Sequence, residues 1–120
     1  MAGLAQVFKR SSSDLNGSAA AGVRRQVVFA ADGTVTSRVL TDGGTVAPWH
    51  QHLDHDTVVY VVNGRFDVET ADGVTTGVAG DFLHVPRRTV HREINPATTA
   101  SEVIVVRTGA GPDYEAADAR

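Results

Sequence analysis

The fold is constrained most by a series of short segments rich in β-branched residues, separated by glycine or proline. Two of the separators contain the Asp-Gly pair that favours a tight hairpin, at Asp32-Gly33 and at Asp72-Gly73. Seven or eight such segments follow residue 24, and no stretch of ten residues shows a helical period. A chain of 120 residues has one core to fill. The pattern therefore predicts an all-β domain, either a sandwich or a barrel.

Both ends of the chain lack this pattern. Residues 9–22 are small and polar, and the end of the chain from residue 109 is small, acidic and without periodicity. Neither end offers an apolar face to bury. We therefore expect a flexible N-terminal arm over residues 1–22, a β-barrel domain over 23–108 and a flexible C-terminal tail over 109–120.

Charge and hydropathy limit the partners of the protein. Eleven Lys and Arg against fourteen Asp and Glu give a net charge of −3, so no broad positive field is available to hold nucleic acid. No apolar run is long enough to cross a bilayer, and Lys9 and Arg10 follow the first apolar residues in an order unlike that of a signal peptide. These features predict a cytoplasmic protein that binds neither nucleic acid nor membrane.

The chain contains no cysteine, so a metal ion could be held only by nitrogen and oxygen ligands. All five histidines lie between residues 50 and 91. In an extended strand His50 and His52 project to the same face, as two ligands of one ion must. This pair alone also fits two solvated or hydrogen-bonded histidines. A third imidazole comes from His91, on a new strand that begins after the bend at Pro86.

At this point the sequence resembles the cupin superfamily, through the spacing of two motifs. The first motif has its residues at Gly44, His50, His52, Thr57 and Gly64. The second has them at Gly80, Pro86, Arg88, His91 and Asn95. The resemblance covers about residues 25–107, and it implies a double-stranded β-helix, which is a jelly-roll-like antiparallel barrel.

The resemblance also implies that His50, His52 and His91 are ligands of one divalent transition metal. Imidazole ligands suit Fe, Zn, Ni, Mn, Co or Cu, so the metal stays open. The chain departs from the family pattern in two places. Thr57 stands where the family has a glutamate ligand, and its neutral hydroxyl is a poor ligand for such an ion. Arg88 stands where the second motif has glycine, so this turn must accept strain or a different φ.

Three side chains are candidates for the place that Thr57 leaves empty, or for acid–base catalysis. Asp56 could turn inward and supply the missing carboxylate, and His55 is a second substitute; both also fit a solvated loop. Glu93 lies two residues after His91, so their side chains project to the same face of a strand, and Glu93 could face the cavity as a general acid or base. The alternative for Glu93 is a surface ion pair with one of three nearby arginines, Arg87, Arg88 or Arg92.

The predicted function is a metal-dependent enzyme acting on a small organic molecule. It would be a dioxygenase-like oxygenase, or a cyclase, isomerase or lyase that uses the metal as a Lewis acid; the alternative is a non-catalytic cupin that binds or senses a small ligand. Four aromatic residues surround the motifs, and such side chains form either the core or the wall of a pocket; we expect the core for each of Trp49, Tyr60, Phe66 and Phe82. The apolar segment at residues 24–30 is placed to add to a neighbour's sheet, which predicts a homodimer.

Overall fold

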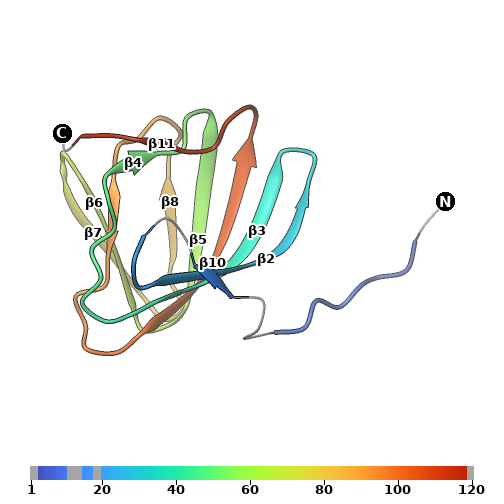
Figure 1. The fold of residues 1–120 in the computed structure, drawn as a ribbon, viewed down its shortest axis with the longest axis horizontal. Coiled ribbons are helices and arrows are strands. Elements are labelled where there is room, and N and C mark those ends of the chain that lie inside the picture. The colour runs from blue at the N-terminus through green and yellow to red at the C-terminus, as the bar shows by residue number, and fades with distance from the viewer. Residues whose placement is uncertain (1–2, 11–14, 18–19, 119–120) are drawn as a thin grey trace.

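Antiparallel strands form all the regular structure in the computed structural model, which describes residues 3–10, 15–17 and 20–118 (Figure 1). The strands are β1 (Asn16–Gly17), β2 (Val23–Ala31), β3 (Thr34–Thr41), β4 (His50–Gln51), β5 (His55–Asn63), β6 (Arg65–Thr70), β7 (Gly73–Val78), β8 (Phe82–Val85), β9 (Arg92–Ile94), β10 (Ser101–Gly109) and β11 (Glu115–Ala116). In the described part of the chain, no helix is long and apolar enough to cross a membrane.

The strands form two principal sheets. The larger sheet has the order β1-β2-β3-β10-β5-β8, and the smaller has the order β7-β6-β9. Figure 1 shows β6 and β7 on one side of the molecule and β3, β10 and β5 on the other, so that the sheets enclose the core. Neighbours such as β10 and β5 are distant in sequence, as expected for a jelly-roll-like barrel. The predicted all-β antiparallel barrel is confirmed.

The core lies between the two sheets because their strands alternate buried and exposed side chains. In β5 the side chains at 57, 59 and 61 are buried, and those at 58, 60 and 62 are exposed. Its neighbour β10 buries the side chains at 103, 105 and 107 in the same way. The buried apolar cluster consists of Val39, Val59, Val61, Phe66, Val68, Leu83, Val85, Val103 and Val105.

Two turns adopt left-handed backbone conformations. Asp32 and Gly33 have φ values of 52° and 77°, as a two-residue hairpin between β2 and β3 requires. Arg88, in place of the motif glycine, has φ of 60° and thus accepts the strain that the sequence predicted. Its amide donates to the carbonyl of Leu53 at 2.9 Å, and its guanidinium pairs with Asp54 at 2.8 Å. These contacts hold the strained turn against the loop before β5.

A buried amide braces the segment that leads into β4. Asn95, which is 1% exposed, donates from Nδ2 to the carbonyls of Thr41 at 3.1 Å and Thr99 at 3.0 Å. Further along the same segment, the amide of Ala47 donates to the carbonyl of Glu93 at 2.9 Å. The chain that carries His50 is therefore held alongside β9.

The aromatic residues divide between the core and the outer surface. Phe66 is buried in the core as predicted, but the prediction was wrong for Tyr60 and Phe82, which are 36% and 72% exposed. Tyr60 pairs in register with Phe82, and their rings lie 4.7 Å apart on the outward-facing side of β5 and β8. Trp49 is half-buried beneath the guanidinium of Arg92, 4.7 Å from the ring centre.

The chain ends differ from each other. The arm predicted over residues 1–22 lies partly outside the described residues, since residues 1–2, 11–14 and 18–19 are not described. Residues 3–10 project from the barrel (Figure 1), and Arg10 pairs with Glu102 at 2.6 Å. The tail predicted over residues 109–120, of which 119–120 are not described, instead turns back across the barrel. There β11 pairs with β4, with Glu115 opposite Gln51.

Candidate metal centre

Three histidines from two segments meet inside one end of the barrel. His50 and His91 face each other across an isolated bridge, in which each amide donates to the other's carbonyl at 2.9 Å. His52 follows two residues after His50, and its ring centre lies 5.3 Å from that of His91. All three side chains are buried, with exposures of 6%, 6% and 1% for His50, His52 and His91. The pairing therefore brings together the imidazoles that the sequence predicted as ligands.

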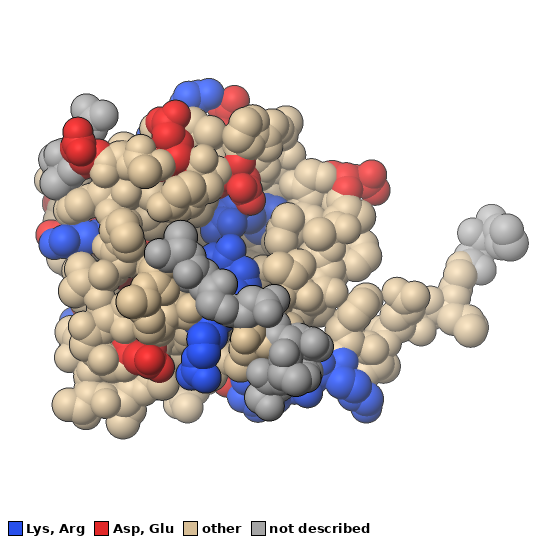
Figure 2. Space-filling view, viewed as in Figure 1, with Lys and Arg blue, Asp and Glu red and all other residues tan. Residues whose placement is uncertain are grey.

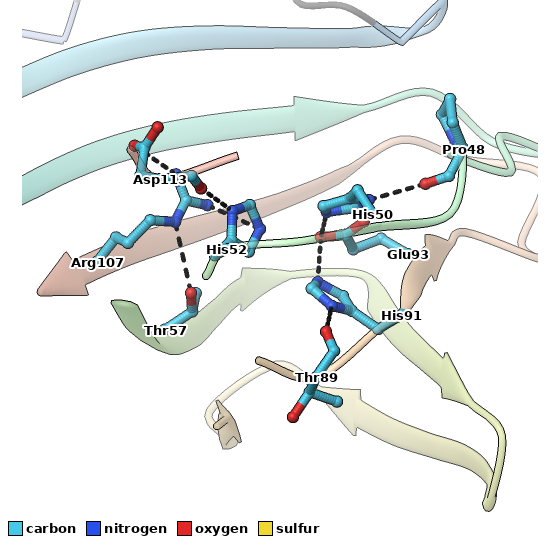
Figure 3. Close-up of polar contacts among 9 residues, drawn as sticks. All are labelled: Pro48, His50, His52, Thr57, Thr89, His91, Glu93, Arg107 and Asp113. Carbon is cyan, nitrogen blue, oxygen red and sulfur yellow. Dashed lines mark hydrogen bonds and ion pairs between the residues drawn. The ribbon is translucent and has the colours of Figure 1, made fainter. Parts of the chain in front are cut away.

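A backbone carbonyl fixes the orientation of each ring. Nδ1 of His50 lies 2.8 Å from the carbonyl oxygen of Pro48, and Nδ1 of His91 lies 2.8 Å from that of Thr89 (Figure 3). Nδ1 of His52 lies 2.6 Å from the carbonyl oxygen of Asp113. A carbonyl only accepts, so each Nδ1 carries the proton and donates it. In a neutral imidazole this leaves Nε2 as the free electron-pair donor, the usual arrangement in metal-binding histidines.

Glu93 completes the cluster. Its Oε1 lies 3.4 Å from Nε2 of His50 and 3.4 Å from Nε2 of His91. One ligand atom from each of the four side chains lies within 4.8 Å of the others. Of the two expectations for Glu93, the cavity-facing one is correct: the three nearby arginines pair elsewhere, with Asp56, Asp54 and Glu69.

The charges in the cluster are coupled. Burial lowers the pKa of His50, but the hydrogen bond and negative charge of Glu93 outweigh burial and raise that pKa above its ordinary value. Burial raises the pKa of Glu93, but its contacts with Nε2 of His50 and His91, which donate to the carboxylate when those rings are protonated, outweigh burial and hold the Glu93 pKa well below its usual range. Burial, followed by the charge of Arg107, lowers the pKa of His52 to about 3. At neutral pH the cluster therefore contains an ionised carboxylate and a neutral His52.

Thr57 lies beside a buried arginine. Figure 3 shows Arg107, from β10, reaching toward Thr57 and His52. Its Nε lies 3.5 Å from Oγ1 of Thr57, and its Nη2 lies 3.4 Å from Nε2 of His52. Arg107 is only 7% exposed. Burial and then the charge of Arg25 lower the Arg107 pKa, although an arginine remains a cation at neutral pH. The guanidinium cation of Arg107 therefore lies beside the Thr57 hydroxyl, next to the histidine cluster.

The cluster opens into a cavity of about 280 Å³, large enough for a small organic molecule. One part of its wall consists of the histidines, Glu93 and the two arginines Arg25 and Arg107. Val59 and Val61 share the face of β5 that carries Thr57, which predicts that both line the cavity; the prediction is confirmed for Val59 but wrong for Val61, which is buried in the core cluster. The other apolar residues of the wall are Ala20, Val23, Val39, Ala47, Pro48, Phe66, Val85, Val103 and Val105. Figure 2 shows basic side chains in a hollow at the centre of this face of the molecule.

The other predicted candidates do not reach the cluster. Asp56 lies on the opposite side of β5, where its carboxylate accepts from Arg87 at 2.9 Å and pairs with His84 at 3.1 Å. Hydrogen bonds from Arg87, and then from His84, lower the Asp56 pKa to about 2. Its register explains this position, because Asp56 shares the outward parity of Val58 and Tyr60. His55 is buried opposite Gly109 of β10 and is not part of the four-residue cluster.

The sequence analysis missed three residues of the site: Arg107, Asp113 and Tyr114. The ring of Tyr114 stacks on His50, with 5.3 Å between centres and 21° between planes. Arg107 left a signal in the sequence, since it continues the buried parity of Val103 and Val105 in β10. Asp113 and Tyr114 have no such signal in the sequence. Asp113 acts through its backbone carbonyl, which any residue has, and Tyr114 reaches His50 only because the tail turns back across the barrel.

Comparison with known proteins supports the fold. The model of a family described as a cupin domain matches residues 37–107. The chain is similar to the structure of KdgF from Halomonas sp., with 27% identity and a TM-score of 0.76 over 90% of this chain and 96% of that one. No curated protein matches the chain.

Two further solved structures show likeness of fold alone. The polyketide cyclase RemF from Streptomyces resistomycificus has 15% identity and a TM-score of 0.76, covering 96% of this chain and 88% of that one. A protein with a double-stranded β-helix domain from Klebsiella pneumoniae has 18% identity and a TM-score of 0.77, covering 94% of this chain and 99% of that one.

Proposed function

The chain belongs to the cupin domain family, and from its histidine cluster we propose that it is a metal-dependent enzyme acting on a small organic molecule. One observation carries the proposal. Each of His50, His52 and His91 gives its Nδ1 proton to a backbone carbonyl, which leaves three Nε2 atoms directed toward one another. Three solvated or merely structural histidines have no need of three such matching orientations.

The donor set fits a divalent transition metal. Three imidazole nitrogens suit Fe, Zn, Ni, Mn, Co or Cu, and no thiolate is present to select among them. We assign His50, His52 and His91 as the ligands. When bound, such an ion supplies Lewis acidity that polarises a carbonyl or carboxylate oxygen of the substrate. Thr57 is not a ligand, because its hydroxyl lies against Arg107.

Glu93 is the proposed general acid–base residue. Its carboxylate stays ionised at neutral pH and its Oε1 lies 3.4 Å from both His50 and His91, so it can accept a proton from a substrate held beside them. The apolar wall, which includes Val59, Val85 and Val105, excludes water from that transfer. The contacts with His50 and His91 that lower the Glu93 pKa would be lost if a metal ion took the two Nε2 atoms, and the carboxylate would then be a stronger base. Such a base suits reactions that begin by removing a proton from carbon, as in an isomerase, cyclase or lyase. The structural neighbour RemF is a cyclase of the same fold.

Hydrogen exchange tests this proposal without knowledge of the natural substrate. The protein loaded with each metal in turn is incubated in D₂O with a panel of small carbonyl compounds and organic acids, and NMR follows deuterium at carbon. We expect exchange for at least one member of the panel, dependent on the metal and abolished by Glu93→Gln, which removes the base while the three histidines remain. Asp56→Asn is the matched control, because that carboxylate faces outward.

The alternatives give different results in the same experiment. Binding of panel members without exchange would contradict the enzyme proposal and favour a non-catalytic ligand-binding cupin. Consumption of dioxygen by the iron-loaded protein, without exchange, would favour an oxygenase. Exchange that survives removal of the metal would contradict the role of the metal.

We also propose that the protein forms a homodimer through the outer face of β2. Val27 and Phe29 are 55% and 48% exposed there, and Phe8 of the arm contacts Phe29 at 6.3 Å between ring centres. In the described part of the chain, β1 pairs with Arg24 and Arg25 near one end of β2, and we place the second copy along residues 27–31 at the other end. Light scattering should give the mass of a dimer, and Phe29→Glu should give that of a monomer. A monomeric wild-type protein would contradict this assignment.

A further inference from the structure

Arg107 is a buried cation whose protein partners hold it only loosely. Its guanidinium lies 3.5 Å from Thr57, 3.4 Å from His52 and 3.6 Å from Oδ2 of Asp113. A charge-assisted hydrogen bond between a guanidinium and a carboxylate is normally about 2.7–2.9 Å long. Asp113 is itself 46% exposed on its side chain, so it neutralises Arg107 only in part. Burial of a charge without a strong partner is costly, and function is one reason to retain it.

Arg25 adds a second cation to the same cavity wall. It comes from β2, lines the cavity and is half-buried. Its Nε is buried and has no hydrogen-bond partner, and none of the ion pairs among the described residues includes Arg25. Arg25 and Arg107 line the same cavity, and the positive charge of Arg25 contributes to the lowered pKa of Arg107. Two cations in the wall of one cavity favour the binding of an anion there.

The acidic residues of the cavity do not serve this purpose. Among the described residues that line the cavity, only Glu93 and Asp113 are acidic, and Glu93 already contacts His50 and His91. The wall also contains apolar side chains, including Val103 and Val105 on the same strand as Arg107. The cavity therefore combines a cationic corner, an apolar wall and the histidine cluster within about 280 Å³.

We propose that Arg107, supported by Arg25, binds a carboxylate of the substrate, so that the substrate is a small organic acid with an apolar body. The planar fork of a guanidinium matches the two oxygens of a carboxylate. A bulkier tetrahedral phosphate needs more donors than this corner offers, since Arg107 already directs Nε at Thr57. Because Nη2 of Arg107 is 3.4 Å from Nε2 of His52, an acid held there lies beside the histidine cluster. This assignment names the substrate class of the proposed enzyme and so rests on the proposed function.

Binding of three matched probes to the metal-free protein tests the carboxylate site. Benzoate, benzamide and phenyl phosphate share one apolar ring and differ in the head group. Calorimetry on protein stripped with a chelator should give benzoate an affinity about tenfold or more above that of benzamide, with phenyl phosphate weaker than benzoate. Equal affinities for benzoate and benzamide would overturn the proposal. Tighter binding of phenyl phosphate than of benzoate would overturn the proposal and indicate that the site binds a phosphate ester.

Variants locate the probe on Arg107. Arg107→Gln should reduce benzoate affinity to that of benzamide, and Arg25→Gln should weaken it less. Arg107→Lys keeps the charge without the fork and should give an intermediate affinity, which also shows that the barrel tolerates substitution here. Arg24→Gln is the matched control, since it removes a neighbouring, exposed arginine of β2. Unchanged benzoate affinity in a folded Arg107→Lys or Arg107→Gln protein would overturn the proposal.

The same measurements separate this proposal from the metal assignment. Arg107→Gln should keep the wild-type metal content, while His91→Ala should lose metal and still bind benzoate through Arg107. Benzoate that binds only to the metal-loaded protein, with an affinity unchanged by Arg107→Gln, would show that the anion binds the metal and would contradict the proposed site at Arg107. If the wild-type protein takes up no metal yet binds benzoate through Arg107, the carboxylate site stands and the proposed enzyme does not.

Discussion

His50 and His91 exchange two backbone hydrogen bonds of 2.9 Å, so the strand pairing itself sets the distance between their imidazoles. Their ring centres lie 4.4 Å apart as a result. Glu93, two residues after His91, then has the same parity and reaches both Nε2 atoms. The centre is therefore built mainly by backbone geometry, with His52 held separately by the tail.

The tail is expected to stabilise both the barrel and the centre. Removal of residues 112–120 deletes β11, the carbonyl of Asp113 that holds His52 at 2.6 Å, and the ring stacked on His50. Thermal unfolding of the truncated protein should occur roughly 5 °C lower or more. Its metal affinity should fall about tenfold, because a partner that orients a ligand is lost.

Two point variants separate these contributions of the tail. Tyr114→Ala removes only the stacked ring and should lower the melting temperature by less than the truncation does. Glu115→Gln keeps the backbone pairing of β11 and should behave as the wild type. A truncated protein with unchanged melting temperature and metal affinity would show that the tail does not support the site.

Metal affinity should rise with pH near neutrality. The pKa of His50 is raised because Glu93 stabilises its protonated form, so below that pKa a proton competes with the metal at Nε2. Affinity should fall by up to about tenfold per pH unit as the pH drops below the raised pKa of His50, and metal binding should release a proton. His52 does not contribute, since its pKa of about 3 keeps it neutral in this range.

Calorimetry in buffers of different ionisation enthalpy measures the released proton directly. Glu93→Gln removes the cause of the raised His50 pKa and should move the pH dependence to lower pH. Metal affinity without any pH dependence down to about pH 5.5 would contradict the assignment of His50 as a ligand.

His52 should make the metal-free protein less stable in acid. Its pKa is about 3 in the folded protein and 6.5 ordinarily, so below pH 6.5 the unfolded chain binds a proton that the folded protein does not. At pH 5 this difference removes about 2 kcal/mol from the free energy of unfolding. Urea unfolding at pH 7 and pH 5 should show a smaller loss in His52→Gln than in the wild type. An equal loss in both would contradict the buried, neutral state of His52.

A glutamate at position 57 is expected to engage Arg107. Thr57 is 4% exposed and its Oγ1 lies 3.5 Å from Nε of Arg107, so the carboxylate of Thr57→Glu would form a buried ion pair there. Benzoate affinity should fall to that of benzamide, while metal content stays as in the wild type. Thr57→Val, which removes the hydroxyl alone, should retain both. Tighter metal binding by Thr57→Glu would show that the added carboxylate reaches the ion instead.

The motif spacing was sufficient to predict the barrel and the meeting of His50, His52 and His91, because alternation along strands and the bend at Pro86 fix which side chains face inward. The same spacing placed Arg88 at a glycine position of the motif and left open strain or a different φ; its φ of 60° shows that the turn accepts the strain. Parity also placed Glu93 correctly, but it could not decide between the cavity and a surface ion pair. That choice depended on the partners of the arginines, which lie far away in sequence.

Other features depend on contacts that the sequence does not display. Alternation along β5 places Tyr60 on the outer face, although its aromatic ring favours burial. The ring of Tyr60 packs against that of Phe82 on the surface instead of entering the core. The tail has no periodic apolar face, and its position rests on two-residue pairing and on carbonyl contacts available to any sequence. Arg107 was missed because an arginine at a strand end usually reaches solvent.

The assignment of His50, His52 and His91 as metal ligands is tested most directly by metal content. Protein purified without affinity metal, then equilibrated with Co(II) and desalted, is measured by mass spectrometry of the metal. We expect one ion per chain in the wild type and in Thr57→Ala, and about a tenth of that or less in His91→Ala, since loss of one of three imidazoles removes most of the chelate. Full metal content in His91→Ala, or loss of metal in Thr57→Ala, would contradict the ligand assignment.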